Sequence, residues 1–183
     1  MEDSKKKIIL KEIFNMSIYC LVLLFATFFI VEYVTQRTQV LGESMENTLH
    51  DGDHLMVDKI TYRFAEPERF DIIVFPYHEQ QEILYIKRII GLPNETVRID
   101  EDGYIYIDGE VLAESYGKEV IQDAGIASTE IVLGDNEYFV LGDNRNNSKD
   151  SRDASVGFIT RDEMVGQAFV RIWPFDSIEL LED

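Results

Sequence analysis

The stretch IFNMSIYCLVLLFATFFIV, residues 13–31, decides the overall arrangement of this 183-residue chain. It carries no charged residue, and as a helix it would span about 28 Å, close to the ~30 Å hydrocarbon core of a bilayer. A buried helix of a soluble protein would show a polar stripe, and a cleaved signal peptide would end in a small-x-small site. This stretch has almost no polar stripe and runs into Glu32 and Tyr33 instead. It therefore predicts an uncleaved signal anchor that crosses a membrane once.

The basic residues beside this anchor indicate its orientation. Only Arg37 follows within twenty residues, whereas four lysines precede the anchor, namely Lys5, Lys6, Lys7 and Lys11. Cytoplasmic flanks of membrane spans are enriched in Lys and Arg. We therefore expect residues 1–12 in the cytoplasm and residues 32–183 as an extracytoplasmic domain of a cell-membrane protein.

The composition narrows the possible partners and cofactors. A formal net charge of −18 argues against nucleic acid as a partner, because its phosphates would be repelled over most of the surface. Cys20 is the only cysteine, so no internal disulfide can form. Of the three histidines, His50 and His54 are four residues apart, but the turn Asp51-Gly52-Asp53 separates them, so they do not form a helical metal-binding pair. We therefore expect neither a metal nor another cofactor.

Short strands separated by turns dominate the chain after Tyr33. Period-two alternation and turn residues predict strands at residues 54–60, 70–75, 82–90, 96–100, 104–108, 138–141 and 167–173, with Pro76 ending the second of them. Residues 96–108 indicate a hairpin, residues 161–165 one helical turn, and residues 112–135 a variable loop or partial strand pair. Many strands and few helices predict a mainly β, antiparallel, barrel-like domain.

Two residues of this domain suggest nucleophilic chemistry when taken together. Ser44 lies in Gly42-Glu43-Ser44-Met45, where a serine on its own could simply cap a turn. Lys87 lies inside an apolar strand between Tyr85 and Ile89 on one face, from which its amine could also extend to water. If that face is buried, desolvation lowers the lysine pKa, and the neutral amine can act as general base toward a serine.

A third segment, Gly142 to Arg152, is dense in Gly, Asn and Asp and predicts a tight loop. A calcium loop is disfavoured because the Gly and the distal Glu of the EF-hand spacing are missing. The charges of this segment balance in sign, which favours ion pairs. Ser148 could orient the Lys87 amine, as the third member of a triad does.

Four motifs together resemble the ordered motif boxes of the bacterial type I signal peptidases, Ser–Lys dyad proteases also called leader peptidases, in the single-anchor form. The motifs are Gly42-Glu43-Ser44-Met45 with Thr48-Leu49, Gly52-Asp53 with Val57, Tyr85-Ile86-Lys87-Arg88-Ile89-Ile90-Gly91-Leu92-Pro93, and Gly142-Asp143-Asn144-Arg145 with Asn147-Ser148 and Asp150-Ser151-Arg152. The likeness extends over nearly the whole chain, anchor included.

This resemblance implies a membrane-bound serine endopeptidase that removes signal peptides from secreted preproteins after a small-x-small motif. Ser44 would be the nucleophile, Lys87 the general base and Ser148 the residue that orients the lysine. Positions that match the family's substrate pockets are Val40, Leu41, Met45, Leu49, Tyr85 and Ile86, and those that match its structural ion pairs are Arg88 with Asp143 and Asp150 with Arg152.

Four positions depart from the family pattern. Asn47 replaces the usual proline after the nucleophile, Asn146 replaces an aspartate, and Phe70 stands where a glycine is usual. Gly42 occupies the place where some members carry an oxyanion-stabilising serine. The oxyanion hole would then use backbone N–H groups at Ser44 and Gly42.

Alternatives to a general signal peptidase remain at this point. A member of the same family could be dedicated to a pilin or a few surface proteins, and a membrane-anchored assembly factor could use the same fold without cleaving. The assembly factor is disfavoured because Ser44 and Lys87 are both present. A self-cleaving repressor protease, which also uses a Ser–Lys pair, is disfavoured by the anchor and by the lack of a DNA-binding helical domain.

Overall fold

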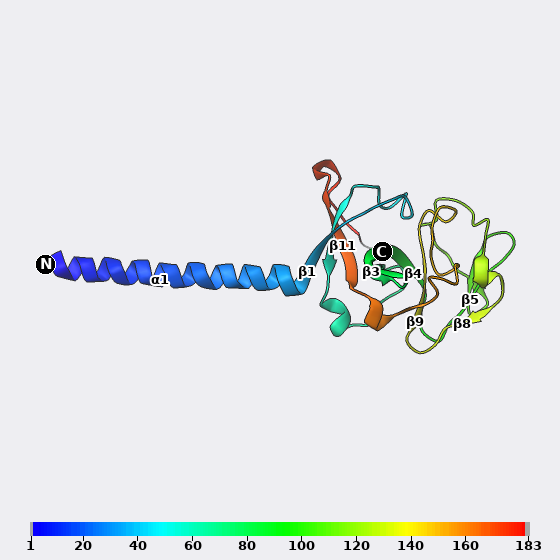
Figure 1. Ribbon diagram of the computed structural model, residues 1–183, viewed down its shortest axis with the longest axis horizontal. Helices are drawn as coiled ribbons and strands as arrows, with labels where there is room; N and C mark the ends of the chain where they lie inside the picture. Colours follow the sequence, from blue (N-terminus) through cyan, green and yellow to red (C-terminus); the bar gives the residue numbers. More distant parts are fainter. Residues whose placement is uncertain (1, 182–183) are drawn as a thin grey trace.

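The computed structural model describes residues 2–181, except for the side chains of residues 2–5, 8, 31, 32 and 81, so the Lys5 side chain lies outside the described residues. A long helix, α1 (Glu2–Phe29), projects from a β domain (Figure 1). Its segment Ile9–Phe29 is long and apolar enough to cross a membrane, and none of it is buried in the protein. A π-helical turn, η1 (Ile30–Val34), joins the helix to the first strand. The bounds 13–31 of the membrane span stay a prediction.

The β domain contains a large sheet of eight strands and a small sheet of four. The large sheet has the order β1-β2-β11-β3-β4-β9-β10, with β12 beside β11. Its strands are β1 (Thr35–Gln39), β2 (His54–Asp58), β3 (Ile72–Tyr77), β4 (Gln80–Gly91), β9 (Glu137–Leu141), β10 (Ile159–Thr160), β11 (Gly166–Trp173) and β12 (Glu179–Leu180). The small sheet has the order β7-β6-β5-β8, from β5 (Thr96–Ile99), β6 (Ile105–Ile107), β7 (Glu110–Val111) and β8 (Ile131–Val132).

Every strand pairing among the described residues is antiparallel, which confirms the predicted fold class. Short 3-10 helices fill several connections, namely η2 (Thr61–Arg63), η3 (Gly125–Ser128), η4 (Arg161–Glu163) and η5 (Phe175–Ser177). The predicted hairpin is β5–β6, with Val97 opposite Ile107. The predicted helical turn at 161–165 is η4.

The strand near the C-terminus, β11, lies in the middle of the large sheet. It pairs with β2 on one side, where Ala168 faces Val57, and with β3 on the other, where Gly166 faces Val74. The connection between β1 and β2 carries Ser44, whereas Lys87 lies on β4, beyond β3. β11 therefore joins the two parts of the sheet that supply the two candidate residues.

Alternation along β4 explains why Lys87 is buried. Tyr85 and Ile89, its neighbours on the same face, both pack in the hydrophobic cluster that contains Phe75 and Tyr138. Side chains that point to the opposite face join two other clusters: Ile86 packs with residues of β2 and β3, and Ile90 with residues of the small sheet. The strand is buried on both faces, so the lysine amine has little access to water.

Two features of the sheet differ from the sequence-based expectation. Pro76 does not end β3, because the strand continues to Tyr77 and Pro76 lies opposite Leu84 just before a shift in register. β1 is an unpredicted strand. Its sequence, TQRTQ, has no apolar alternation to reveal it, which suits an edge strand whose pairing among the described residues is with β2 alone.

The segment 112–135 is largely irregular, apart from η3 and β8, and packs against the 142–152 loop. The Lys118 amide donates to the carbonyl of Asp143 at 2.8 Å, and the Ile126 amide donates to the carbonyl of Arg152 at 3.0 Å. Glu114 adds an ion pair with Arg145 at 2.8 Å. The segment therefore supports the loop of residues 142–152, the third loop, from outside.

Candidate active site

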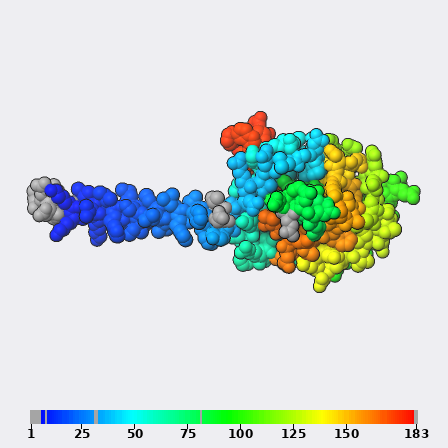
Figure 2. Space-filling model, viewed as in Figure 1, coloured from blue at the N-terminus to red at the C-terminus, as the bar shows by residue number. Residues whose placement is uncertain are grey.

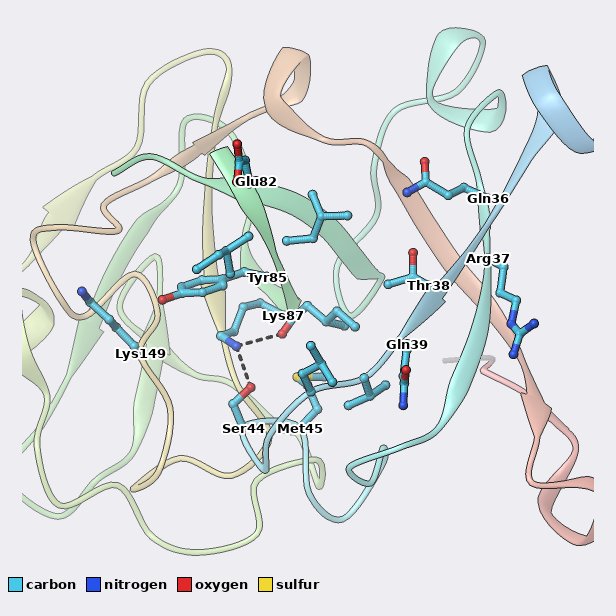
Figure 3. Close-up of a pocket in the computed structure, with 15 residues that line it drawn as sticks. Gln36, Arg37, Thr38, Gln39, Ser44, Met45, Glu82, Tyr85, Lys87 and Lys149 are labelled. Carbon is cyan, nitrogen blue, oxygen red and sulfur yellow. Dashed lines mark hydrogen bonds between the residues drawn. The ribbon is translucent and has the colours of Figure 1, made fainter. Parts of the chain in front are cut away.

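The structure brings Ser44 and Lys87 into direct contact. The Lys87 amine donates to the Ser44 hydroxyl oxygen at 2.7 Å and to the carbonyl oxygen of Ile86 at 2.9 Å (Figure 3). Only 3% of the Lys87 surface is exposed. This burial lowers the pKa of Lys87 from 10.5 to about 8, against the opposite effect of the Asp150 and Asp143 charges. The neutral amine is therefore a minor but accessible form near neutral pH, and it becomes the major form above pH 8.

Contacts from two other segments hold the loop that carries Ser44. The Ser44 carbonyl accepts the Asn144 amide at 3.1 Å, and the Asn144 side chain donates to the carbonyl of Glu43 at 3.0 Å. On the far side, Arg171 of β11 donates to the carbonyl of Thr48 at 3.1 Å. The 142–152 loop and β11 thus fix the position of Ser44 against β4.

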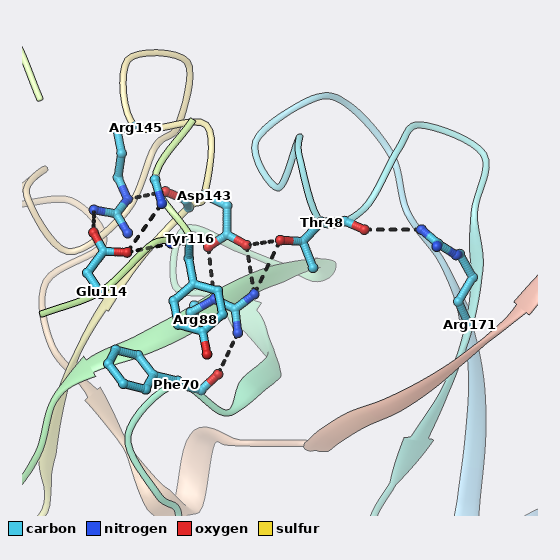
Figure 4. Close-up of polar contacts among 10 residues, drawn as sticks. Thr48, Phe70, Arg88, Glu114, Tyr116, Asp143, Arg145 and Arg171 are labelled. Atoms are coloured by element: carbon cyan, nitrogen blue, oxygen red, sulfur yellow. Dashed lines mark hydrogen bonds and ion pairs between the residues drawn. The ribbon is translucent and has the colours of Figure 1, made fainter. Parts of the chain in front are cut away.

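The predicted ion pair between Arg88 and Asp143 is present and fully buried. Arg88 donates to both carboxylate oxygens, at 3.0 and 2.8 Å, and the Thr48 hydroxyl donates to the same carboxylate at 2.5 Å (Figure 4). Tyr116 covers the other side, with its ring centre 3.8 Å from the guanidinium carbon. This cluster joins β4, the third loop, the loop that carries Ser44 and the 112–135 segment.

The second predicted ion pair, Asp150 with Arg152, lies within the third loop. Arg152 binds both carboxylate oxygens at 2.8 Å, and Asp150 also accepts the Gly142 amide at 3.1 Å. Both charges act on Lys87: Asp150 raises its pKa, and Arg152 lowers it. Because the two effects are opposite, the ion pair changes the pKa of Lys87 less than either charge alone would.

Ser148 lies beside the dyad but does not make the predicted contact with Lys87. Its hydroxyl is buried and has no hydrogen-bond partner in the part of the chain that the structure describes. The oxygen lies against Gly142 instead: a Cβ atom there would be 2.2 Å from it and 2.4 Å from the Ser44 carbonyl oxygen. Only glycine permits this close approach of the two segments. The expected hydrogen bond from Ser148 to Lys87 is not made.

The two expected oxyanion donors behave differently. The Gly42 amide donates to the Asp51 carboxylate at 2.8 Å, and its role as an oxyanion donor stays a prediction. The Ser44 amide has no hydrogen-bond partner among residues 2–181. It is the backbone donor that a developing oxyanion could use.

A groove of about 580 Å³ lies in front of the dyad, between β1 and β4 (Figure 3). Five of the predicted substrate residues line it: Val40, Leu41, Met45, Tyr85 and Ile86. The sixth, Leu49, is fully buried among Leu55 and Val57 and belongs to the core. Sequence reasoning missed the wall formed by residues 36–39 of β1 and the contribution of Lys149.

The departures from the family pattern have local structural explanations. Asn47 has a φ of +73°, which asparagine tolerates and proline cannot adopt. Phe70 has a φ of +78°, the left-handed region that explains the usual glycine, and its ring packs 5.0 Å from that of Tyr116. Asn146 donates to the carbonyl of Val120 at 2.9 Å and so binds the 112–135 segment.

Comparisons with known proteins agree on one family. The profile described as "Signal peptidase, peptidase S26" matches residues 11–173. A probable signal peptidase I-2 from Synechocystis is 38% identical over 160 residues, which cover 82% of this chain and 69% of that protein. Signal peptidase IB from Staphylococcus aureus is 32% identical over 189 residues, covering 95% of this chain and 94% of its own. A crystal structure of a signal peptidase I from Enterococcus faecalis is 34% identical and covers 56% of this chain and 97% of its own, with a TM-score of 0.45.

Proposed function

The chain belongs to the signal peptidase family, peptidase S26, and on this basis we propose that Ser44 is the nucleophile and Lys87 the general base of its reaction. The protein is a membrane-anchored serine peptidase that removes signal peptides from secretory preproteins. The observation that carries the proposed roles is the 2.7 Å contact between a serine hydroxyl and a buried lysine amine at the base of a groove.

The two residues can carry both halves of the reaction. Neutral Lys87 takes the Ser44 proton while the serine oxygen attacks the scissile carbonyl carbon, and the ammonium then gives this proton to the leaving amine. The resulting acyl-enzyme is hydrolysed when Lys87 takes a proton from water and the oxygen of that water attacks the ester. Ser44 is reprotonated as the acid product leaves.

The proposed oxyanion donor is the Ser44 amide. It lies on the nucleophile itself, and the carbonyl on the other side of this residue is already fixed by Asn144. A preorganised donor of this kind stabilises charge that develops on the carbonyl oxygen. Because the Gly42 amide is hydrogen-bonded to Asp51, a second oxyanion donor would be in place only after the substrate has bound.

The groove supports an extended substrate. β1 and β4 form its walls, and the buried side chains of Val40, Met45 and Ile86 lie next to Ser44. Small residues at the first and third positions before the cut fit this apolar surface. We further propose that residues 1–12 stay in the cytoplasm and that the β domain faces outside. Four lysines, Lys5, Lys6, Lys7 and Lys11, precede the predicted span 13–31, whereas Arg37 alone follows it within twenty residues.

The test uses full-length protein in detergent and a preprotein with Ala-x-Ala before its mature start. Wild type is expected to cut after the second alanine, which the product masses identify. Ser44→Ala and Lys87→Met should abolish cleavage, whereas Ser177→Ala, at a serine on η5 far from the dyad in sequence, should leave it unchanged. Full activity in Ser44→Ala or Lys87→Met would overturn the assigned roles. Wild-type protein that binds the preprotein without cutting it would support the assembly-factor alternative.

A further inference from the structure

The groove in front of the dyad has a direction, because one of its walls comes straight from the membrane anchor. β1 begins at Thr35, directly after η1, and Gln36 and Arg37 line this end of the groove. In Figure 2 the light-blue segment after the helix runs along the domain next to the green of β4. A signal peptide carries its apolar segment before the cleavage site, and such a segment favours the bilayer. The signal peptide therefore enters past Gln36, and the mature part of the substrate leaves on the other side of Ser44.

Lys149 lies where the mature part of the substrate leaves the groove. Figure 3 shows it on the opposite side of the dyad from Gln36. Lys87 Nζ lies 5.2 Å from the centre of the Tyr85 ring, which stacks on the Tyr77 ring with 4.8 Å between ring centres. Lys149 Nζ lies 4.7 Å from the centre of the Tyr77 ring. An extended chain advances about 3.3 Å per residue, so Lys149 is within reach of the first few residues after the cut.

The Lys149 ammonium is held in place by a tyrosine and not by a carboxylate. It donates to the Tyr77 hydroxyl oxygen at 2.6 Å, and this hydroxyl donates its own proton to Glu79 at 2.7 Å. Lys149 is exposed and forms no ion pair within the part of the chain that the structure describes. An ammonium has three N–H donors, so two remain for a ligand. The bond to Tyr77 also raises the pKa of Lys149, which keeps the amine charged.

Lys149 supplies the fixed positive charge on the mature side of Ser44. The charged residues that line the groove are Arg37, Glu82, Lys87 and Lys149, and Lys87 must be neutral to act as the base. Asp153, just after the third loop, acts on the Lys149 charge from beyond ion-pair distance. The whole chain carries −18, so a substrate carboxylate is repelled over most of the surface and attracted at Lys149.

We propose that Lys149 is a specificity-determining residue that binds a carboxylate side chain at the first or second position of the mature chain. The carboxylate accepts a hydrogen bond from the Lys149 ammonium, whereas a basic side chain at these positions is repelled. Lys149 thereby adds a charge preference after the cut to the preference for small residues before it. This inference rests on the proposed function, because it requires a substrate chain whose scissile carbonyl lies at Ser44.

The experiment uses full-length protein in detergent and preproteins that differ only in having Glu or Gln at the first or second mature position. The measured quantity is the ratio of kcat/KM for the Glu substrate to that for the Gln substrate. In wild type this ratio should be about two to five, the range for an exposed ion pair, and high salt should reduce it. Lys149→Gln should bring the ratio to about one, and Lys149→Arg should retain it. A change in the ring stack alters both rates together and leaves the ratio unchanged.

Two further variants act as controls. Arg98→Gln also removes a cation from a tyrosine ring, since the Arg98 guanidinium carbon lies 4.4 Å from the centre of the Tyr106 ring in the small sheet. It should keep the wild-type ratio. Asp153→Asn removes the negative charge that acts on Lys149, so it should raise the ratio above that of wild type.

The outcomes separate this inference from the proposed function. Equal cleavage of the Glu and Gln substrates by wild type would overturn the inference and leave the peptidase roles intact, whereas no cleavage of any substrate would overturn both. An equal loss of preference in Arg98→Gln would show that net charge alone determines the ratio. If Lys149→Gln changes cleavage only when Glu is the middle residue of Ala-x-Ala, Lys149 contacts the signal-peptide side, and the inference is wrong.

Discussion

The buried amine of Lys87 makes a quantitative prediction for the pH dependence of cleavage. With a pKa of about 8, about 90% of the amine is neutral at pH 9, about 9% at pH 7 and about 1% at pH 6. Only the neutral form can accept the Ser44 proton. The value of kcat/KM should therefore fall about tenfold for each pH unit below 7 and level off above pH 9.

The assay follows cleavage of a preprotein that has no titratable group near the cut, at substrate concentrations far below KM, between pH 6 and pH 10. Under these conditions the rate reports kcat/KM, whose pH dependence reflects ionisations of the free enzyme. Asp150→Asn supplies a second measurement. It removes the charge that raises the pKa of Lys87 and leaves Arg152, which lowers it, so the rising limb should move to lower pH.

Three results would refute this reasoning. A rate that rises through pH 10 would indicate a lysine with an ordinary pKa near 10.5, hence one that is not desolvated. A midpoint near 6.5 would indicate a histidine as the base. A shift to higher pH in Asp150→Asn, with the fold intact by circular dichroism, would mean that the assigned electrostatic effect has the wrong sign.

Four substitutions test other features. Lys87→Met should raise the unfolding free energy by about 3 kcal/mol at pH 7, because the lysine of the unfolded chain holds its proton more tightly than the buried lysine does. This gain should disappear near pH 10.5, and thermal unfolding across a pH series measures it. Gly142→Ala should lower kcat at least tenfold without unfolding the protein, because a Cβ would collide with the Ser148 hydroxyl. Asn47→Pro should abolish cleavage, because proline cannot adopt a φ of +73°. Tyr116→Leu should lower the unfolding free energy by about 1–2 kcal/mol, measured by thermal unfolding, because it removes the ring over a buried guanidinium.

Each substitution has a control or a contrary outcome. An unchanged or lower stability of Lys87→Met at pH 7 would contradict the cost of burying its charge. Wild-type turnover in Gly142→Ala would mean that the third loop can move away from the nucleophile loop. Asn47→Gly should keep full activity. If Asn47→Pro is as active as the wild type, residue 47 does not need the left-handed backbone conformation. Tyr116→Phe should keep wild-type stability, whereas Tyr106→Leu, which removes a ring over Arg98 in the small sheet, should cost less.

The resemblance of four motifs to one family was sufficient to predict that Ser44 and Lys87 come together and that both ion pairs form, because the residue types and their order along the chain carry that information. Alternation also placed Tyr85, Lys87 and Ile89 on one face, but it left open whether that face is buried, as the structure shows it to be. The atomic contacts could not be predicted. Whether Ser148 reaches the amine, or whether the Gly42 amide is already bound to Asp51, depends on loop conformations that composition does not determine.

Other gaps have similar physical causes. Leu49 and Met45 are both apolar, and nothing in the sequence separates a groove wall from the core behind it. The contact of Tyr116 with Arg88 could not be predicted, because the 112–135 segment, which carries Tyr116, has no periodicity. β1 was missed because an edge strand can have polar side chains on both faces.

The central position of β11 has a consequence for when activity can arise during synthesis. Ser44 and Lys87 lie on parts of the sheet that are joined by a strand ending at Trp173, ten residues before the C-terminus. Arg171 of that strand also holds the loop after the nucleophile. In a chain made from its N-terminus, both candidate residues are synthesised long before β11 is available. Activity should therefore arise only once β11 has paired with β2 and β3, late in synthesis.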